Sequence, residues 1–167
     1  MPAKKSKSPA VPKSGRPNVP GYGLSKNKKG LLAWKWAQSQ LQKSRQYWIV
    51  TVRPDGSPHL MIIWGVWVDD GFYFSTGKNT RKAKNLAANP RCVIGSEDAA
   101  QAVIVEGSVR PFEDREKLKK LFAAYKKKYK YDVSDMGEPF YFVAPSVAFG
   151  LIEKKFPTTF TRWVFPQ

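Results

Sequence analysis

Hydrophobic positions recur with two different periods along this chain, and the change of period locates its elements. From Gly30 to Ser44 apolar side chains recur every three or four residues, which predicts an amphipathic helix covering one end of a sheet. From Tyr47 onward, β-branched and aromatic runs alternate with Gly, Pro, Asn and Asp, which predicts short strands joined by tight turns. The expected strands are 47–53, 58–68, 72–75, 92–96, 101–111, 147–152 and 160–165.

Two later segments return to the helical period. Residues 80–88 read as a short helix, capped by Asn79 or Thr80 and stopped by Asn89 and Pro90. Residues 114–129 read as a longer helix that Asp114 caps. A mainly β chain with six or seven antiparallel strands and few helices favours a closed or nearly closed barrel, because closure removes exposed sheet edges. Gly107 is a candidate β-bulge in that barrel.

The positive charge of the chain is unevenly distributed. The formal net charge is +16, and half of it lies in residues 1–30, which contain no acid. Residues 1–25 are rich in Pro, Gly, Ser and Lys, so we expect a disordered basic arm followed by one domain over 26–167. The chain has no long apolar run or secretory signal pattern, which predicts a soluble cytoplasmic protein without a membrane partner.

The usual catalytic constellations are missing from the sequence. His59 is the only histidine and Cys92 the only cysteine, so a histidine-rich metal site and an internal disulfide are both excluded. The adjacent acidic pairs fall where turns and helix caps are expected. A hydrolase is therefore disfavoured and no metal is expected, whereas chemistry carried by a cofactor needs no such side chains.

The segment from Tyr73 to Pro90 has the features of a phosphate site. A strand there leads through a hydroxyl- and glycine-containing loop into a helix whose first turn holds Thr80, Arg81 and Lys82. Free backbone N–H groups and two cations at a helix N-terminus suit an anion. Cations at that end oppose the helix dipole unless an anion is present. The alternative interpretation is a solvated basic turn.

Two aromatic clusters are further candidates. In residues 64–67, alternation places Trp64 and Val66 on one face of a strand and Gly65 and Trp67 on the other. The glycine would let a flat ring approach the backbone, although barrel core with one aromatic at a subunit contact is the better explanation of the pattern taken alone. Near the C-terminus, Arg162 and Trp163 point to opposite sides of a strand, where either residue suits a structural role.

Taken in order, several segments carry a family resemblance: 48–59, 72–77, 80–86, 89–90, 105–107 and 161–165. Together they resemble the pyridoxamine 5'-phosphate oxidase-like proteins from about Leu32 to Phe165. The resemblance implies a split β-barrel homodimer with FMN or a deazaflavin relative at the dimer interface. The chain lacks the Arg-x-Val-Leu-x-Lys strand and the Arg-Leu-His element of the oxidase itself. It therefore resembles the general family branch that includes FMN reductases, deazaflavin-dependent reductases and haem-linked members, of which the single His59, expected where a turn leads into a strand, makes haem the least favoured.

The resemblance also implies a set of cofactor-binding residues, but no catalytic acid or base. Thr80, Arg81 and Lys82 resemble the phosphate clamp, beside a strand over 61–67 whose backbone faces the flavin ring. Arg162 and Trp163 match the family's C-terminal cofactor contacts, contributed by the partner subunit. The implied residues are Ser75, Thr76, Thr80, Arg81, Lys82, Ile62, Ile63, Trp64, Gly65, Arg162 and Trp163.

These inferences favour an FMN-dependent oxidoreductase acting on an unidentified small-molecule substrate. A reductase that uses the 8-hydroxy-5-deazaflavin coenzyme of F420 type is one alternative, because the anionic tail of that coenzyme suits a basic surface. A flavin-binding protein without turnover is another. A nucleic-acid-binding barrel is the remaining alternative, disfavoured because half of the positive charge lies in the expected arm.

Overall fold

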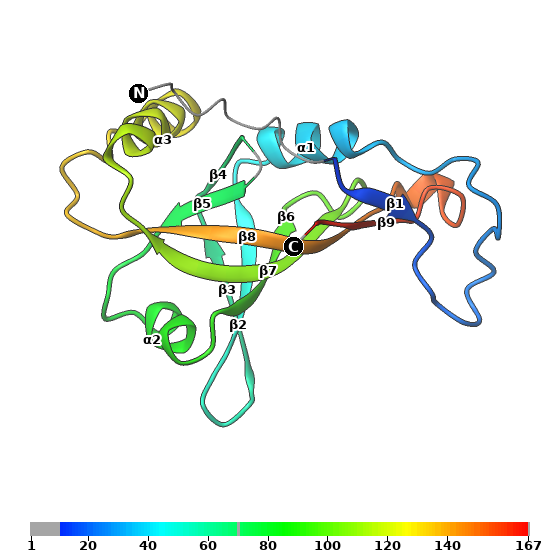
Figure 1. Ribbon diagram of the computed structural model, residues 1–167, viewed down its shortest axis with the longest axis horizontal. Coiled ribbons are helices and arrows are strands. Elements are labelled where there is room, and N and C mark those ends of the chain that lie inside the picture. The colour runs from blue at the N-terminus through cyan, green and yellow to red at the C-terminus, as the bar shows by residue number, and fades with distance from the viewer. Residues whose placement is uncertain (1–10, 70, 167) are drawn as a thin grey trace, which may run out of the picture.

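The computed structural model describes residues 11–69 and 71–166, which form one antiparallel sheet with three α-helices (Figure 1). The strands are β1 (Lys13–Gly15), β2 (Tyr47–Val52), β3 (Pro58–Ile63), β4 (Val66–Val68), β5 (Gly71–Ser75), β6 (Arg91–Ser96), β7 (Val103–Phe112), β8 (Phe140–Gly150) and β9 (Thr161–Val164). The helices are α1 (Trp34–Lys43), α2 (Arg81–Ala88), α3 (Arg115–Tyr129) and the short 3-10 helix η1 (Glu153–Lys155).

The two longest strands, β7 and β8, pair along their full lengths and form the middle of the sheet. On its other side, β8 pairs first with β5 and then with β9. From β7 the sheet continues through β6 and β2 to the edge strand β3. Consecutive strands β3 and β4 do not pair with each other, so the curled sheet stays open between them. The expected mainly β split barrel is confirmed.

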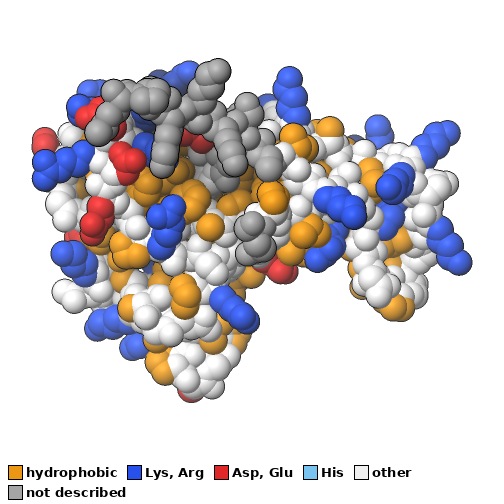
Figure 2. Space-filling view, viewed as in Figure 1, with side chains coloured by type: hydrophobic (Ala, Val, Ile, Leu, Met, Phe, Trp, Pro, Cys, Tyr) orange, Lys and Arg blue, Asp and Glu red, His pale blue; other side chains and the backbone are white. Residues whose placement is uncertain are grey.

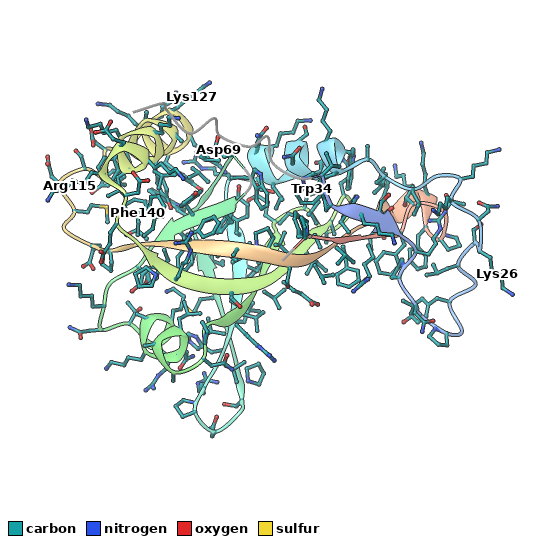
Figure 3. The ribbon with its side chains drawn as sticks, in the orientation of Figure 1. Lys26, Trp34, Asp69, Arg115, Lys127 and Phe140 are labelled. Atoms are coloured by element: carbon teal, nitrogen blue, oxygen red, sulfur yellow. The ribbon has the colours of Figure 1, made fainter. Side chains whose placement is uncertain are left out.

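The core has two parts, each covered by one helix. Under α1, Trp34 packs edge-on against Trp67, Trp163 and Phe165, and Figure 3 shows Trp34 where α1 meets the sheet. Under α3, Tyr125 packs edge-on against Phe140 at the start of β8. Both helices thus bury the apolar faces that the sequence periodicity predicts. Among the described residues, no helix is long and apolar enough to cross a membrane.

Several local expectations are confirmed. Thr80 caps α2 and Asp114 caps α3, each through a side-chain oxygen that accepts a backbone N–H three residues later. The pairing of β7 with β8 shifts register between Glu106 and Gly107, where the bulge is expected. A Cβ added to Gly107 would lie 2.4 Å from the carbonyl oxygen of Ala144, so the close approach of β8 requires glycine here.

The prediction of a single strand over 58–68 is wrong. The chain leaves β2 after Ile63 and joins β5 from Val66, and both Val66 and Trp67 are buried. The backbone between these strands bonds to α3 instead of to the sheet. The Gly65 N–H donates to the Tyr129 hydroxyl over 2.8 Å, and the Gly65 carbonyl accepts from Lys128 Nζ over 3.1 Å. The alternation expected across residues 64–67 therefore fails.

Two strands differ from those that the sequence pattern predicts. β8 begins at Phe140, whereas the pattern predicts a strand only from residue 147. The pattern misses the first part of β8 because it contains Pro145, which lies opposite the bulge in β7. β1 lies inside residues 1–25, where a disordered arm is expected. It pairs with β9, so this part of the segment is ordered. Residues 1–10 of that arm lie outside the described residues.

Candidate cofactor-binding site

The N-terminus of α2 presents free hydrogen-bond donors beside two cations. Thr80 Oγ1 accepts the Ala83 N–H over 3.2 Å, and the Thr80 carbonyl accepts from Lys84. Within the described chain the backbone N–H groups of Arg81 and Lys82 have no partner. No acidic residue lies in this first turn. The helix end thus combines free N–H groups with side-chain cations, the arrangement that binds phosphate.

The hairpin formed by β2 and β3 packs directly against α2. Asn85 Nδ2 donates to Thr51 Oγ1 over 3.0 Å, and both residues are fully buried. Thr51 pairs across the hairpin with His59, whose Nδ1 lies 3.5 Å from the same Oγ1. This polar contact fixes the start of β3 against the helix. It therefore places His59, only partly buried, on the side of the hairpin that faces α2.

Four side chains form what we call the cationic cluster: Arg53, His59, Arg81 and Lys82. Desolvation lowers the pKa of His59, and the positive charges of Arg53, Lys82 and Arg81 lower it further. Burial also lowers the pKa of Lys82. The ion pairs of the described residues are Lys119–Glu116 and Lys126–Asp132, so no member of this cluster forms an ion pair, although the exposed Asp55 acts electrostatically on Arg53. Cations without ion pairs around free N–H groups suit a dianionic phosphate.

The two hydroxyl residues predicted at the anion pocket lie next to α2 but bond to the protein. Ser75 Oγ donates to the Pro139 carbonyl over 2.9 Å, and Thr76 Oγ1 lies 3.2 Å from Thr80 Oγ1. Both contacts shape the loop that leads into the helix. The loop from Gly77 to Thr80 lines an open cavity of about 540 Å³, which Glu138 also lines. Because the negative charge of Glu138 would repel an anion there, the cationic cluster is the better anion site.

The strand over 61–67 that is expected to face the flavin ring offers it fewer residues than the sequence suggests. β3 is an edge strand, and among the described residues no strand pairs with its outer edge. Its backbone groups are therefore free for a flat heteroaromatic ring that carries both donors and acceptors. Ile62 points outward and is 48% exposed, whereas Ile63 is buried in the core. The backbone around these two residues is the part of the strand that a ring could reach.

Trp64 and Gly65 take part in internal packing. The Trp64 ring stacks on Tyr129 with 4.4 Å between centroids and 7° between planes. A Cβ added to Gly65 would lie 2.1 Å from the Phe72 ring, so the flat ring that approaches this glycine is Phe72. The close approach expected at Gly65 therefore exists, but it belongs to the core. Trp64 keeps one exposed face near the end of β3.

Arg162 and Trp163 lie on β9, away from α2 within one chain (Figure 1). Trp163 is fully buried in the core beneath α1, so its indole is unavailable to a cofactor. Arg162 points to the other face of the sheet, beside Gly15 of β1 and Phe149 of β8. There it lines an open cavity of about 610 Å³. The two C-terminal residues thus differ sharply in what they can contact.

The outer face of the sheet is unusually apolar. Directly paired residues share a face, and one such row crosses five strands: Ile62, Trp48, Gly95, Ile104 and Phe149. Trp48 is 42% exposed and Ile104 is 39% exposed. The next row on this face contains Leu60, Val50, Val93 and Val147, with the exposed Glu106 between Val93 and Val147. A sheet face of this composition suits burial against another surface better than contact with water.

Sequence reasoning missed Arg53 and His59 as members of the site. The hairpin turn at residues 54–57 places them near each other, and this much is visible in the sequence. Their position against α2 depends on the buried Thr51–Asn85 contact between distant segments. The lone Cys92 is buried, and burial raises the pKa of its thiol to about 12, so it does not supply a thiolate at neutral pH. The described residues contain no group of His, Cys, Asp and Glu suited to a metal.

Comparisons with known proteins agree with this fold. The family profile described as pyridoxamine 5'-phosphate oxidase matches residues 33–155. A conserved hypothetical protein of Mycobacterium tuberculosis has a TM-score of 0.67 and 20% identity, covering 78% of this chain and 91% of that one. An F420 reductase has a TM-score of 0.55 and 24% identity, covering 66% and 94%. A heme storage protein of Vibrio cholerae has a TM-score of 0.55 and 17% identity, covering 66% and 87%. None of the curated proteins matches the chain.

Proposed function

The chain belongs to the pyridoxamine 5'-phosphate oxidase family, and on that premise we propose that it is an FMN-dependent oxidoreductase. One observation carries the proposal: the cationic cluster, none of whose members forms an ion pair among the described residues, lies beside the free edge of β3. The cluster offers a site for a phosphate, and the adjacent strand edge offers backbone groups to a flat ring. A flavin mononucleotide joins these two chemical features in one molecule.

Each part of the site has a role in this proposal. The free N–H groups and side chains of Arg81 and Lys82 hold the phosphate, and Thr80 keeps them in place by capping α2. The β3 backbone near Ile62 orients the ring. When bound, the flavin supplies hydride transfer at its N5 atom. The protein residues bind and orient the cofactor and exclude water from it, which needs no catalytic acid or base.

We further propose that the apolar outer face forms a homodimer interface. The rows through Trp48 and Leu60 would be buried against a second copy, which explains why both carry large apolar side chains. Arg162 lies on the same face and would reach the partner's cofactor, whereas the buried Trp163 supports Arg162 from beneath. The dimer would also exclude water from the edge of β3.

A deazaflavin coenzyme of F420 type is the second candidate for this site. The exposed side chains of Lys78, Arg81 and Lys84 extend the positive surface around α2 and suit a longer anionic tail. The fold likeness to an F420 reductase is consistent with this candidate. The substrate in either case is a small molecule that stacks over the ring. A protein that binds flavin without turnover uses the same residues and is separated from these candidates by an activity assay.

The experiment that tests the proposal is a titration of the purified full chain with FMN, riboflavin and the deazaflavin coenzyme, at low and moderate salt. Saturable FMN binding, with riboflavin much weaker because it lacks the phosphate, is the expected result. Binding of the deazaflavin alone, weakened by salt, would replace FMN by the second candidate. Binding of neither cofactor would reject the proposed function. Light scattering of the same sample measures the expected dimer mass.

A further inference from the structure

We propose that His59 is an anion-binding residue of this site, which takes up a proton when a phosphate binds to the cationic cluster. The identity of the phosphate compound rests on the proposed function. The contribution of His59 does not, because any phosphate held between the hairpin and α2 would lie next to the imidazole. The inference is carried by the position of the ring and by the charges around it.

The position of His59 is determined by buried neighbours. It faces Thr51 across the β2–β3 hairpin, and Thr51 is held in turn by Asn85 of α2. The Thr51 hydroxyl can donate to His59 Nδ1 when the ring is neutral and accept from it when the ring is protonated. Both protonation states thus keep the ring in the same place. In both states Nε2 carries a hydrogen and can donate to a ligand.

The charges around the ring have one sign. Arg53 acts on His59 from its own hairpin, and Arg81 and Lys82 act on it from α2. No carboxylate of the described residues is among the groups that act on this ring. Desolvation, together with these cations, holds the pKa of His59 below its ordinary value of 6.5. Without an anion, the ring is therefore neutral at neutral pH, and the cluster avoids a further positive charge.

A bound phosphate reverses this electrostatic effect. Its negative charge would offset Arg81 and Lys82 and favour the imidazolium, so the pKa of His59 is higher in the complex than in the free protein. By linkage, phosphate affinity is greatest below the lower of these two pKa values. The affinity for phosphate falls as the pH rises through the higher pKa, which is that of His59 in the complex. The second ionisation of a phosphate ester has a pKa of about 6, so the relevant window lies above that value.

The direct test is NMR of the imidazole, because His59 is the only histidine in the chain and its ring signals need no assignment. Its pKa is measured in the full protein alone, with inorganic phosphate, and with FMN. The expected result is a pKa below 6.5 in the free protein that rises when either ligand is added. An unchanged pKa in a protein saturated with FMN or phosphate would overturn the inference.

A substitution supplies the second readout. His59→Gln should weaken FMN binding about tenfold at pH 6.5 and leave it unchanged at pH 8.5. Riboflavin binding should not respond to the substitution at either pH. Met61→Leu, on the same face of β3, is the matched control and should keep the pH dependence of the wild type. The thermal midpoint of each variant shows whether it folds as the wild type does.

The outcomes separate this inference from the proposed function. If FMN binds with an affinity that does not depend on pH and the pKa of His59 does not move, the inference fails and the proposed function stands. If FMN does not bind but inorganic phosphate raises the pKa of His59, the proposed function fails and the anion site stands. If neither ligand binds, both are rejected.

Discussion

Helices α2 and α3 are both rich in Lys and Arg and both have cations in the first turn, but only α3 also has acids there and cations in its last turn. In α3, Asp114 caps the N-terminus, Glu116 lies in the first turn, and the last turn contains Lys126, Lys127 and Lys128. The helix dipole favours these acids and these last-turn cations, and the acids offset Arg115 and Lys117 in the same first turn. In α2 the first turn contains Arg81 and Lys82 with no acid, and the last turn contains no cation.

The surroundings of the two helices differ in the same way. On the face shown in Figure 2, red and blue side chains mix over α3 at the upper left, whereas the charged side chains around α2 at the lower left are blue. Lys119 pairs with Glu116 and Lys126 with Asp132, each over 3.0 Å. Lys127 points away from the sheet into solvent (Figure 3). Lys119 and Lys126 are thus paired with acids, and Lys127 is solvated.

The comparison shows that the position of a charge reveals more about function than the total charge. A cation in the first turn destabilises a helix by about 0.3–1 kcal/mol unless an anion is present. Both cations of α2 destabilise the helix in this way, and both lie next to two free N–H groups. Binding of an anion would remove the destabilisation, so an anion site explains these two cations better than a contribution to solubility does. The predictions that follow test the contrast between the helices.

The largest expected effect concerns cofactor affinity. Replacing Arg81 and Lys82 together by Ala should weaken FMN binding about a hundredfold or more, because each charged contact contributes about 1.5–3 kcal/mol. The same change should leave the free protein as stable as before or slightly more stable, since it relieves the helix dipole. Isothermal titration measures the first effect and urea unfolding the second.

The matched control for this variant removes two cations from α3. Lys126→Ala with Lys127→Ala should not alter FMN affinity, and should destabilise the protein slightly, because these residues favour the dipole and one of them pairs with Asp132. Equal losses of FMN affinity in the two double variants would show that net charge, and not a built site, attracts the cofactor.

An intermediate effect is expected at the two helix caps. Thr80→Ala and Asp114→Ala should each lower the free energy of unfolding by about 1 kcal/mol, because each removes a side-chain acceptor from a backbone N–H. Only Thr80→Ala should also weaken FMN binding, since fraying of α2 displaces Arg81. Chemical denaturation and FMN titration of both variants measure this difference. Similar FMN affinities in the two variants would contradict the assignment of the site to α2.

The smallest expected effect is a pH dependence of stability at the end of α3. Burial lowers the pKa of Lys128 to about 8, so above that pH the unfolded chain binds more protons than the folded one. Stability should therefore rise between pH 8 and the onset of tyrosine ionisation near pH 10. Burial raises the pKa of Tyr129 to about 12, so above pH 10 the folded chain retains that proton and stability falls again.

Lys128→Met should remove the rise between pH 8 and 10, while Lys127→Met should preserve it because Lys127 is exposed. Urea unfolding at several pH values measures both variants. A rise that persists in Lys128→Met would assign the effect to another group. FMN affinity should not change in either variant, because α3 lies outside the proposed site.

Local sequence was sufficient for most elements and for half of the site. Apolar spacing located α1, and spacing together with caps located α2 and α3, since a helix is set by residues three and four positions apart. The misplaced cations Arg81 and Lys82 were also evident locally, because both the helix start and the charges lie within a few residues. β8 was recognised only in its last part, since Pro145 disrupts the local pattern of a strand that distant partners complete.

Tertiary structure decided the contacts between segments far apart in the chain. The sequence by itself determined that a basic helix start follows a strand, but only the fold places Arg53 and His59 against it through the buried Thr51–Asn85 bond. Only the fold assigns Gly65 to the Phe72 ring and buries Trp163 while leaving Arg162 on the outer face. Periodicity and capping act over a few residues, whereas burial and electrostatic environment depend on which distant strands and helices pack together.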